Sequence, residues 1–325
     1  MEKINILITS AGRRVSLVNA FQREARLLNK NIKVYCTDME PQLSSACQIA
    51  DNSFKVKKVT NPLYIEELIS LCKENDIGVI IPTIDTELII LSENKNELVN
   101  NGIFPLISDL DLIEKCRDKR LIHSFFDELK LDRAKEYEID DIEYPCFVKP
   151  FDGSRSVGTF ILSSKSDLTK EIVANKKNMY LDYINPQEYK EFTVDMYFNK
   201  NSEIISIVPR ERIFVRDGEV NKACTRKNSI IPYLRNKFND TKGFRGCITF
   251  QLFKHIVDEK YYSIEINPRF GGGYPLSYLA GSNFPKWIIE EYIMNKEILS
   301  YSEDWNDNTL MLRYDKEVIV HGYQS

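Results

Sequence analysis

The strongest candidates for chemistry are polar side chains in a predicted β-hairpin near the end of the chain. Two apolar segments, residues 247–253 and 261–268, flank a polar turn, which is the pattern of two antiparallel strands. If the turn is centred on Asp258, Gln251 lies directly opposite Glu265. An amide and a carboxylate then meet on one face of the hairpin, among apolar neighbours.

Asn267 joins this pair, because side chains two residues apart on a strand share a face. One carboxylate and two amides suit a hard cation such as Mg²⁺ (or Mn²⁺), with phosphate oxygens and water completing the octahedron. Zinc would require His or Cys, and neither is nearby. Arg269, two residues further along the same face, can grip a phosphate that the metal touches. We therefore predict a metal site of Gln251, Glu265 and Asn267, with Arg269 beside it.

A run of three glycines at 271–273 follows, and glycine lets the backbone approach a ligand closely. The alternative for the whole segment EINPRFGGG is a polar strand end that caps the next helix. That alternative is less favourable, because a buried polar side chain without a partner costs about 1 to 3 kcal/mol.

A lysine in a strand, followed by a loop of small residues, forms a second candidate site. The strand is predicted at 145–150 and contains Lys149, and the loop 153–158 leads into a further strand at 159–162. Such a loop leaves backbone amides free to bind phosphate oxygens. It is not a Walker loop, because no Gly-Lys-Ser or Gly-Lys-Thr follows. Taken alone, the loop also fits an ordinary hairpin, and Lys149 also fits a solvated side chain.

The first third of the chain alternates strands and helices. Apolar strands are predicted at 4–9, 34–36 and 79–82, and helices at 86–99 and, further on, at 114–129. Fully apolar strands between amphipathic helices indicate a parallel sheet covered on both faces. Only one glycine follows the first strand, so the GxGxxG pattern of a dinucleotide-binding fold is missing.

Charged residues follow the carboxyl ends of these strands, where such sheets bind ligands. Two adjacent arginines at the turn after the first strand suit a carboxylate or a phosphate. In the alternative interpretation, Gly12 only makes the turn, Asp38 caps a helix and Glu87 faces solvent. The arginines of PRERIFVR and ACTRKN are equally candidate anchors or surface charge. The candidate substrate anchors are Arg13, Arg14, Asp85, Glu87, Arg210, Arg212 and Arg226.

Length and composition set the class of protein. The 325 residues are expected to form about two compact units of roughly 150 residues each. Hydrophobic residues make up 43% and charged residues 28%, as in globular proteins. A net charge of −4 lacks the basic excess that nucleic-acid binding needs, and no apolar run reaches the roughly 20 residues of a membrane span. Seven cysteines without a CxxC pattern, and no basic leader, predict a cytoplasmic protein with reduced thiols.

Taken in order, these motifs resemble those of the ATP-grasp superfamily, in particular its branch similar to the large subunit of carbamoyl phosphate synthase. The resemblance covers most of the chain. It rests on a helix with Lys119, on FVKP with Lys149, on GSRSVG, on an acidic hinge segment, and on Gln251 followed by EINPR, the most specific motif. Two departures from the family pattern are Arg155 in the loop and Gln251 where many relatives carry an acid, which leaves the number of metal ions open.

The resemblance implies a domain organisation and cofactors. The fold would be α/β, with a Rossmann-like N-terminal domain (1–112) before a two-lobed α+β ATP-grasp module. The module's N-terminal lobe would span 113–184 and its C-terminal lobe 185–325. The cofactors would be ATP and Mg²⁺ (or Mn²⁺). The residues assigned to the nucleotide are Lys119, Lys149, Gly153, Ser154, Ser156, Gly158, Leu181, Asp182, Tyr183, Ile184, Glu188 and Glu191.

The resemblance also implies roles within this set. The two lysines would hold the nucleotide phosphates, and the glycine loop would fold over them. Residues 181–184 would form a hinge that meets adenine mainly through its backbone. Glu191 would take the ribose hydroxyls, with Glu188 as a rival for that role. Arg269 and Asn267 would be the catalytic pair, with the arginine stabilising the transferred phosphoryl group.

The implied activity is an ATP-dependent carboxylate–amine ligase that forms an amide through an acyl phosphate and releases ADP and phosphate. One alternative is a small-molecule kinase that stops after phosphoryl transfer. Another is a nucleotide-binding partner protein without turnover. The expected partners are small-molecule carboxylate and amine substrates, with a homodimer as an option, and neither nucleic acid nor a membrane is expected.

Overall fold

The computed structural model describes residues 4–29, 31–151, 157–216 and 218–323. Of the predicted phosphate loop, Gly158 lies within the described residues. Gly153, Ser154 and Ser156 lie outside them.

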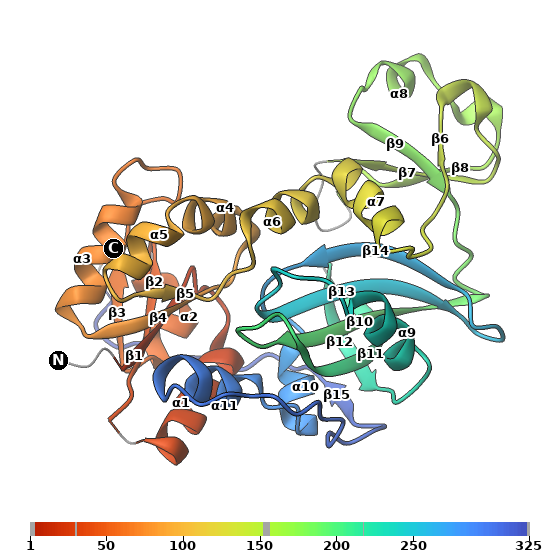
Figure 1. The fold of residues 1–325 in the computed structure, drawn as a ribbon. Helices are drawn as coiled ribbons and strands as arrows, with labels where there is room; N and C mark the ends of the chain where they lie inside the picture. The colour runs from red at the N-terminus through yellow and green to blue at the C-terminus, as the bar shows by residue number, and fades with distance from the viewer. Residues whose placement is uncertain (1–3, 30, 152–156, 217, 324–325) are drawn as a thin grey trace.

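The N-terminal part of the chain forms the predicted parallel sheet with helices on both faces (Figure 1). The strands β1 and β4 are buried at every residue, which explains their unbroken apolar sequence. All pairings in this sheet are parallel, in the order β3-β2-β1-β4-β5. Its strands are β1 (Asn5–Thr9), β2 (Val34–Asp38), β3 (Asn52–Lys55), β4 (Ile77–Pro82) and β5 (Phe104–Pro105), and its helices are α1 (Val15–Leu28), α2 (Ser45–Ile49), α3 (Tyr64–Glu74), α4 (Asp85–Glu93) and α5 (Lys95–Asn100).

The helix predicted over 86–99 is broken at Asn94, between α4 and α5. The Asn94 side-chain amide donates a hydrogen bond to the carbonyl of Ile90 at 2.8 Å. Such a side chain competes with the backbone for hydrogen bonds, which favours a helix end over a helix interior.

The helix predicted over 114–129 is also broken, into α6 (Leu110–Arg117) and α7 (Lys119–Glu128). Asp118 lies between the two, and its carboxylate accepts a hydrogen bond from the backbone N–H of Arg120 at 2.8 Å. Aspartate is a favoured N-cap because it satisfies such unpaired N–H groups. The break places Lys119 at the first position of α7.

Two antiparallel sheets follow the parallel one (Figure 1). The smaller sheet has the order β6-β9-β7-β8, and α8 (Lys170–Ala174) belongs to the same part of the chain. Its strands are β6 (Glu136–Tyr137), β7 (Cys146–Pro150), β8 (Phe160–Leu162) and β9 (Asn178–Asp182). The larger sheet has the order β14-β13-β10-β11-β12-β15. Its strands are β10 (Tyr189–Phe198), β11 (Ile204–Arg216), β12 (Glu219–Thr225), β13 (Gly246–His255), β14 (Tyr261–Asn267) and β15 (Leu310–Leu312), and the helices of this part are α9 (Ile230–Phe238), α10 (Tyr274–Ala280) and α11 (Phe284–Ile288).

The two faces of the six-stranded sheet differ in chemistry. One face is apolar, because Val194, Phe250 and Ile266 lie side by side on neighbouring strands and pack with side chains of α7 and α9. The other face, which we call the polar face, carries two cross-strand rows: Thr193, Gln251 and Glu265, and then Asp195, Thr249 and Asn267. Alternation along each strand therefore separates a hydrophobic core from a polar surface.

A β-bulge sets the predicted pairing of Gln251 with Glu265, which is confirmed. Nearer the turn, Leu252 pairs with Ser263, and the register shifts by one residue before Gln251. Ile264 is the extra residue, so without the bulge Gln251 would face an isoleucine. The sequence prediction placed the centre of the turn at Asp258. The pairing of Leu252 with Ser263 near the turn does not fit that centre, and the bulge restores the predicted pair further along the hairpin.

The polar face continues inward to a buried ion pair. The Arg210 guanidinium donates to both Asp195 oxygens, at 2.7 and 3.0 Å, and the Ser277 hydroxyl donates to the same carboxylate at 2.5 Å. Both charged side chains are at most 1% exposed. A buried ion pair is costly to break from one side only, because the remaining charge stays desolvated.

We expect Asp195→Ala to destabilise the protein by about 3 to 5 kcal/mol, because it leaves Arg210 buried without a counterion. Urea unfolding followed by circular dichroism measures this loss. The matched control is Asp315→Ala, which breaks the exposed Arg216–Asp315 pair and should cost less than about 1 kcal/mol. Equal losses for the two variants would contradict the structural role of the buried pair.

Candidate functional site

Two of the predicted metal ligands, Glu265 and Asn267, lie at the end of β14. The Asn267 side-chain amide donates to Oε1 of Glu265 at 2.9 Å, so its carbonyl oxygen points away from the carboxylate. Gln251 lies across from Glu265 on β13. No group of three or more His, Cys, Asp or Glu side chains in the described part of the chain is arranged to hold a metal. One carboxylate with two amide oxygens fits Mg²⁺ when phosphate oxygens supply further ligands.

Lys149, on β7 of the smaller sheet, lies within electrostatic reach of this group. Burial, and then the positive charge of Lys119, lower the pKa of Lys149 to about 8, and Glu265 opposes the shift. Lys119 donates to the backbone carbonyl of Pro150 at 3.3 Å. Lys149 therefore interacts electrostatically with both Lys119 and Glu265, and the mutual repulsion of the two lysines suits a polyanion.

The predicted ribose ligand Glu191 is paired in this structure. Nε of Arg212 lies 3.0 Å from Oε1 of Glu191, and an Arg212 N–H also donates to the Thr193 hydroxyl. The pKa of Glu191 is raised above its usual value, because the effect of burial exceeds the opposing effect of the Arg212 charge. Arg212 thus lies beside the predicted nucleotide residues, and its guanidinium orients Glu191.

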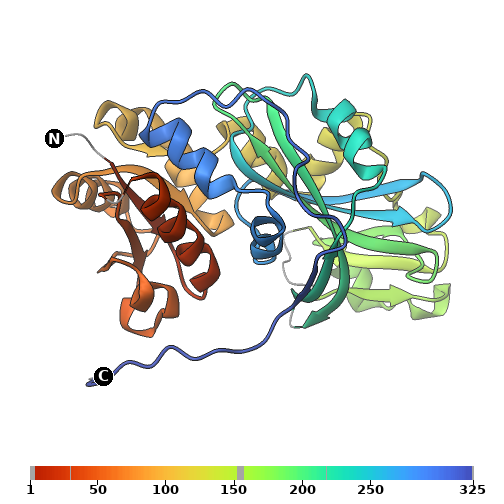
Figure 2. The same cartoon turned by 90° about the horizontal axis from the view of Figure 1, so that it is seen from below.

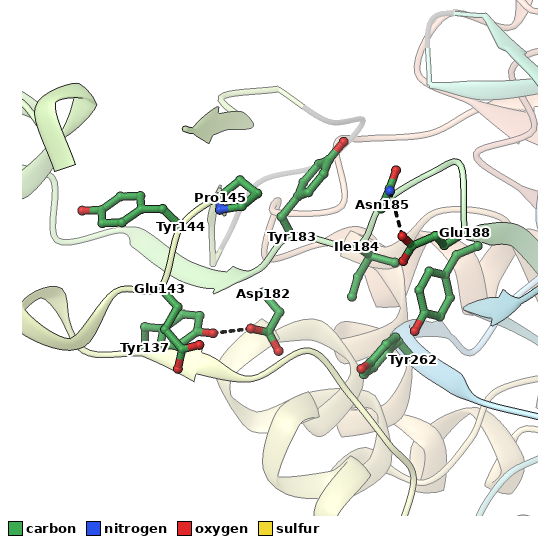
Figure 3. Close-up of a pocket in the computed structure, with 11 residues that line it drawn as sticks. Tyr137, Glu143, Tyr144, Pro145, Asp182, Tyr183, Ile184, Asn185, Glu188 and Tyr262 are labelled. Carbon is green, nitrogen blue, oxygen red and sulfur yellow. Dashed lines mark hydrogen bonds between the residues drawn. The ribbon is translucent and has the colours of Figure 1, made fainter. Parts of the chain in front are cut away.

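A cavity of about 260 Å³ adjoins the predicted hinge (Figure 3). Asp182 accepts a hydrogen bond from the Tyr137 hydroxyl, and Asn185 donates to Glu188 at 3.2 Å. Strand β9 ends at Asp182, so the backbone of Tyr183 and Ile184 lies beyond the sheet ladder. Those two residues line the cavity, as Glu188 does.

Arg269 forms an ion pair across the molecule. Its Nε and one terminal nitrogen donate to the two oxygens of Asp85, at 2.7 and 2.6 Å. Asp85 is the first residue of α4 in the N-terminal sheet domain. The structure therefore uses the predicted substrate anchor Asp85 to hold the predicted catalytic arginine.

Two predicted substrate anchors, Arg210 and Glu87, have buried side chains that bind other residues of the protein. Arg210 is 1% exposed and is bound by Asp195. Glu87 is 0% exposed and accepts hydrogen bonds from Tyr64 and Ser10, and burial raises its pKa. Its helix packs this side chain against the N-terminal sheet, so Glu87 does not face solvent as the alternative interpretation expected.

The remaining predicted anchors lie apart. Arg13 is exposed, and Arg226 is bound to Glu211 at 2.8 Å on the β11–β12 side of the large sheet. Arg14 instead lies near Arg269, in electrostatic contact with it. The same place holds two residues, Arg313 and Glu219, that sequence patterns did not indicate.

Arg313 donates to Glu219 at 2.8 Å and to the backbone carbonyl of Gly272. It follows β15, in the extended C-terminal segment that ends on the side of the N-terminal domain (Figure 2). Its local sequence, LMLRYDKE, contains no motif with a known binding or catalytic spacing and for that reason carries no signal for a site.

Comparisons with known proteins agree with this architecture. A family model described as the PylC-like N-terminal domain matches residues 6–107, and one described as ATP-grasp in the biosynthetic pathway with Ter operon matches residues 177–308. These matches define the class as an enzyme that uses ATP. The chain belongs to the ATP-grasp superfamily and carries a PylC-like N-terminal domain. The comparison with curated proteins finds no match.

Solved structures share the fold at low sequence identity. Pyruvate carboxylase from Rhizobium etli is 16% identical with a TM-score of 0.71, and the match covers 95% of this chain but only 32% of that one. The biotin carboxylase domain dimer of Hydrogenobacter thermophilus 2-oxoglutarate carboxylase, in complex with MgADP, ADP and bicarbonate, is 17% identical with a TM-score of 0.70, covering 95% and 74% of the two chains. N5-carboxyaminoimidazole synthetase from Staphylococcus aureus, complexed with ADP, is 16% identical with a TM-score of 0.68, covering 93% and 81%. No helix of the described residues has the length and apolar character of a membrane span.

Nucleotide affinity should depend on the charge of Lys149. Its pKa of about 8 means that the free protein loses this charge as the pH rises through 8, while a bound phosphate would keep it protonated. The affinity for ADP should therefore fall about tenfold between about pH 7 and about pH 9. Isothermal titration calorimetry measures the profile.

Lys149→Gln should bind ADP more weakly at neutral pH and lose most of the pH dependence. The control is Lys165→Gln, at an exposed position of the same lobe, which should keep the wild-type profile. An unchanged profile in Lys149→Gln would remove Lys149 from the phosphate site.

Proposed function

We propose that the protein is an ATP-dependent carboxylate–amine ligase that forms an amide through an acyl phosphate and releases ADP and phosphate. The observation that carries the proposal is that Lys149, on the small sheet, interacts electrostatically with Glu265 of the large sheet, whose carboxylate accepts a hydrogen bond from Asn267. Cationic and oxygen-donor groups on opposite walls suit a nucleotide with its divalent cation.

The nucleotide roles follow from position. Lys119 and Lys149 would bind the phosphates. The backbone of Tyr183 and Ile184 would meet adenine. Glu191, oriented by Arg212, would accept hydrogen bonds from the ribose hydroxyls.

Gln251, Glu265 and Asn267 would hold Mg²⁺. When bound, the ion supplies neutralisation of charge on the phosphate oxygens. The Asn267–Glu265 hydrogen bond fixes both side chains, so their free oxygens are directed before any ligand arrives.

The chemistry needs positioning more than covalent help. An oxygen of the substrate carboxylate attacks the terminal phosphorus of ATP, and the bond from that phosphorus to ADP breaks. The amine nitrogen then attacks the acyl carbon, phosphate leaves, and the nitrogen loses a proton. Arg269, held near the glycine turn by Asp85, would stabilise the charge of the transferred group.

Glu265→Ala and Asn267→Ala should each reduce ADP formation roughly 100-fold or more. Each variant removes an oxygen ligand of the proposed Mg²⁺ ion, which would otherwise position the phosphates. Their circular dichroism spectra and melting curves should stay close to those of the wild type. The matched control is Asp258→Ala, in the exposed turn of the same hairpin, which should keep full activity. Normal turnover of both site variants would overturn the metal assignment.

Trapping separates the ligase from its alternatives. In a screen of carboxylates with ATP, Mg²⁺ and hydroxylamine, a ligase yields hydroxamate together with ADP and phosphate. A stable phosphorylated product would indicate the kinase, and nucleotide binding without ADP formation across the screen would indicate a partner protein.

A further inference from the structure

Three arginines from distant parts of the chain meet at the glycine turn that follows β14. Arg269 is paired with Asp85, and Arg313 is paired with Glu219 at 2.8 Å. Arg14, at the start of α1, interacts electrostatically with both of these arginines. We call Arg14, Arg269 and Arg313 the arginine cluster. Two carboxylates accompany three guanidinium groups, so the cluster has a surplus of one positive charge.

The surplus charge is on Arg14. The one hydrogen bond of its side chain within the described residues is to the Thr83 carbonyl at 3.5 Å, and no carboxylate of those residues lies within 4.0 Å of it. Burial and then Arg269 lower the pKa of its guanidinium, and Arg313 adds to the shift, while the charges of Glu219 and Asp85 oppose it. A partly desolvated cation next to two others is unfavourable unless an anion joins it.

The backbone at Gly272 allows this approach. A Cβ atom at Gly272 would lie 3.1 Å from a terminal nitrogen of Arg14 and 3.6 Å from a Glu219 carboxylate oxygen. Arg313 donates to the carbonyl of the same glycine. Arg14 and Glu219 therefore both border the space that a side chain at residue 272 would fill, and only glycine leaves that space open.

The start of α1 adds to the positive potential. Arg14 is the N-cap of this 14-residue helix, with no side-chain hydrogen bond to its first N–H groups and no acidic residue in its first turn. The helix dipole therefore points its positive end at the arginine cluster without an internal counter-charge.

We propose that Arg14 and Arg313 bind a carboxylate that does not react, so that one of the two substrates carries a carboxylate besides its reacting group. This inference rests on the proposed ligase function and names a substrate class for it. The planar fork of a guanidinium matches the two oxygens of a carboxylate. Asp85 and Glu219 already balance two arginines, which favours a single negative charge over a phosphate dianion. Arg313 lies outside both matched family segments.

A stability measurement separates a ligand-binding arginine from a structural one. In the absence of ligand, Arg14→Gln should melt at or above the wild-type temperature, because it removes an unbalanced desolvated charge. A structural arginine would lower the melting temperature on removal. The control is Arg26→Gln, at an exposed position of the same helix, which should leave the melting temperature unchanged.

Direct binding is measured by titrating the protein with sodium acetate at constant ionic strength. Binding is detected by NMR chemical shifts or by the change in melting temperature. Acetate should bind the wild type, Arg14→Gln and Arg313→Gln should weaken it by about tenfold or more, and Arg14→Lys should recover part of the affinity. Inorganic phosphate is the competing probe and should bind less tightly than acetate. Equal acetate affinity in wild type and Arg14→Gln, or tighter binding of phosphate, would overturn the proposal.

Enzymatic turnover provides a second, independent test of the proposal. Candidate substrates are offered in pairs, such as an amino acid with its amide and a dicarboxylic acid with its monoester, and ADP formation is measured. The extra carboxylate should be required, and Arg14→Gln should raise KM for that substrate about tenfold while the KM for ATP is unchanged. Equal use of the neutral counterparts would overturn the inference. Absence of ADP formation with every pair would instead overturn the ligase function, since the acetate titration reads the subsite without turnover.

Discussion

The site depends on one constraint: polar groups on an inner sheet face must find partners within the protein. One face of the six-stranded sheet meets this constraint by being apolar and packing on helices. The polar face meets it by a chain of contacts in which Asp195 binds Arg210, Thr249 and Ser277. The Asp195 carboxylate is thus fully engaged by inner groups, whereas Glu265 at the outer end of the face has Asn267 as its hydrogen-bond partner and is the carboxylate that we propose for the ligand.

The bulge at Ile264 is the local device that makes this face continuous. A one-residue change of register turns every following side chain to the opposite face. Here the shift places Glu265, and two residues later Asn267, on the same side as Gln251. Within a few residues, β14 therefore passes from side chains that pack in the core to the polar side chains of the candidate site. Its end leads directly to Arg269 and the glycine turn.

Charge links the separate sheets into one site. Lys149 of the small sheet is influenced by Glu265 of the large sheet, and Arg269 reaches Asp85 of the parallel sheet. Desolvation strengthens each of these interactions, because fewer water molecules screen them. The PylC-like N-terminal domain thus contributes Asp85 and Arg14 to the proposed substrate side of an ATP-grasp module. In the proposed reaction, this arrangement would let the N-terminal domain help to position the substrate.

Local patterns in the sequence determined the parallel sheet, the late hairpin and the motif that carries Glu265, because alternation and turn chemistry act between near neighbours. Tertiary structure alone decided which charges were available. Glu87 and Arg210 are enclosed by residues distant in sequence, and no spacing rule reveals such enclosure. Arg313 reaches the glycine turn because β15 pairs with β12, across roughly ninety residues of chain. Long-range packing fixes burial and ion pairing, so the partners of a charged side chain are known only when the chain is folded.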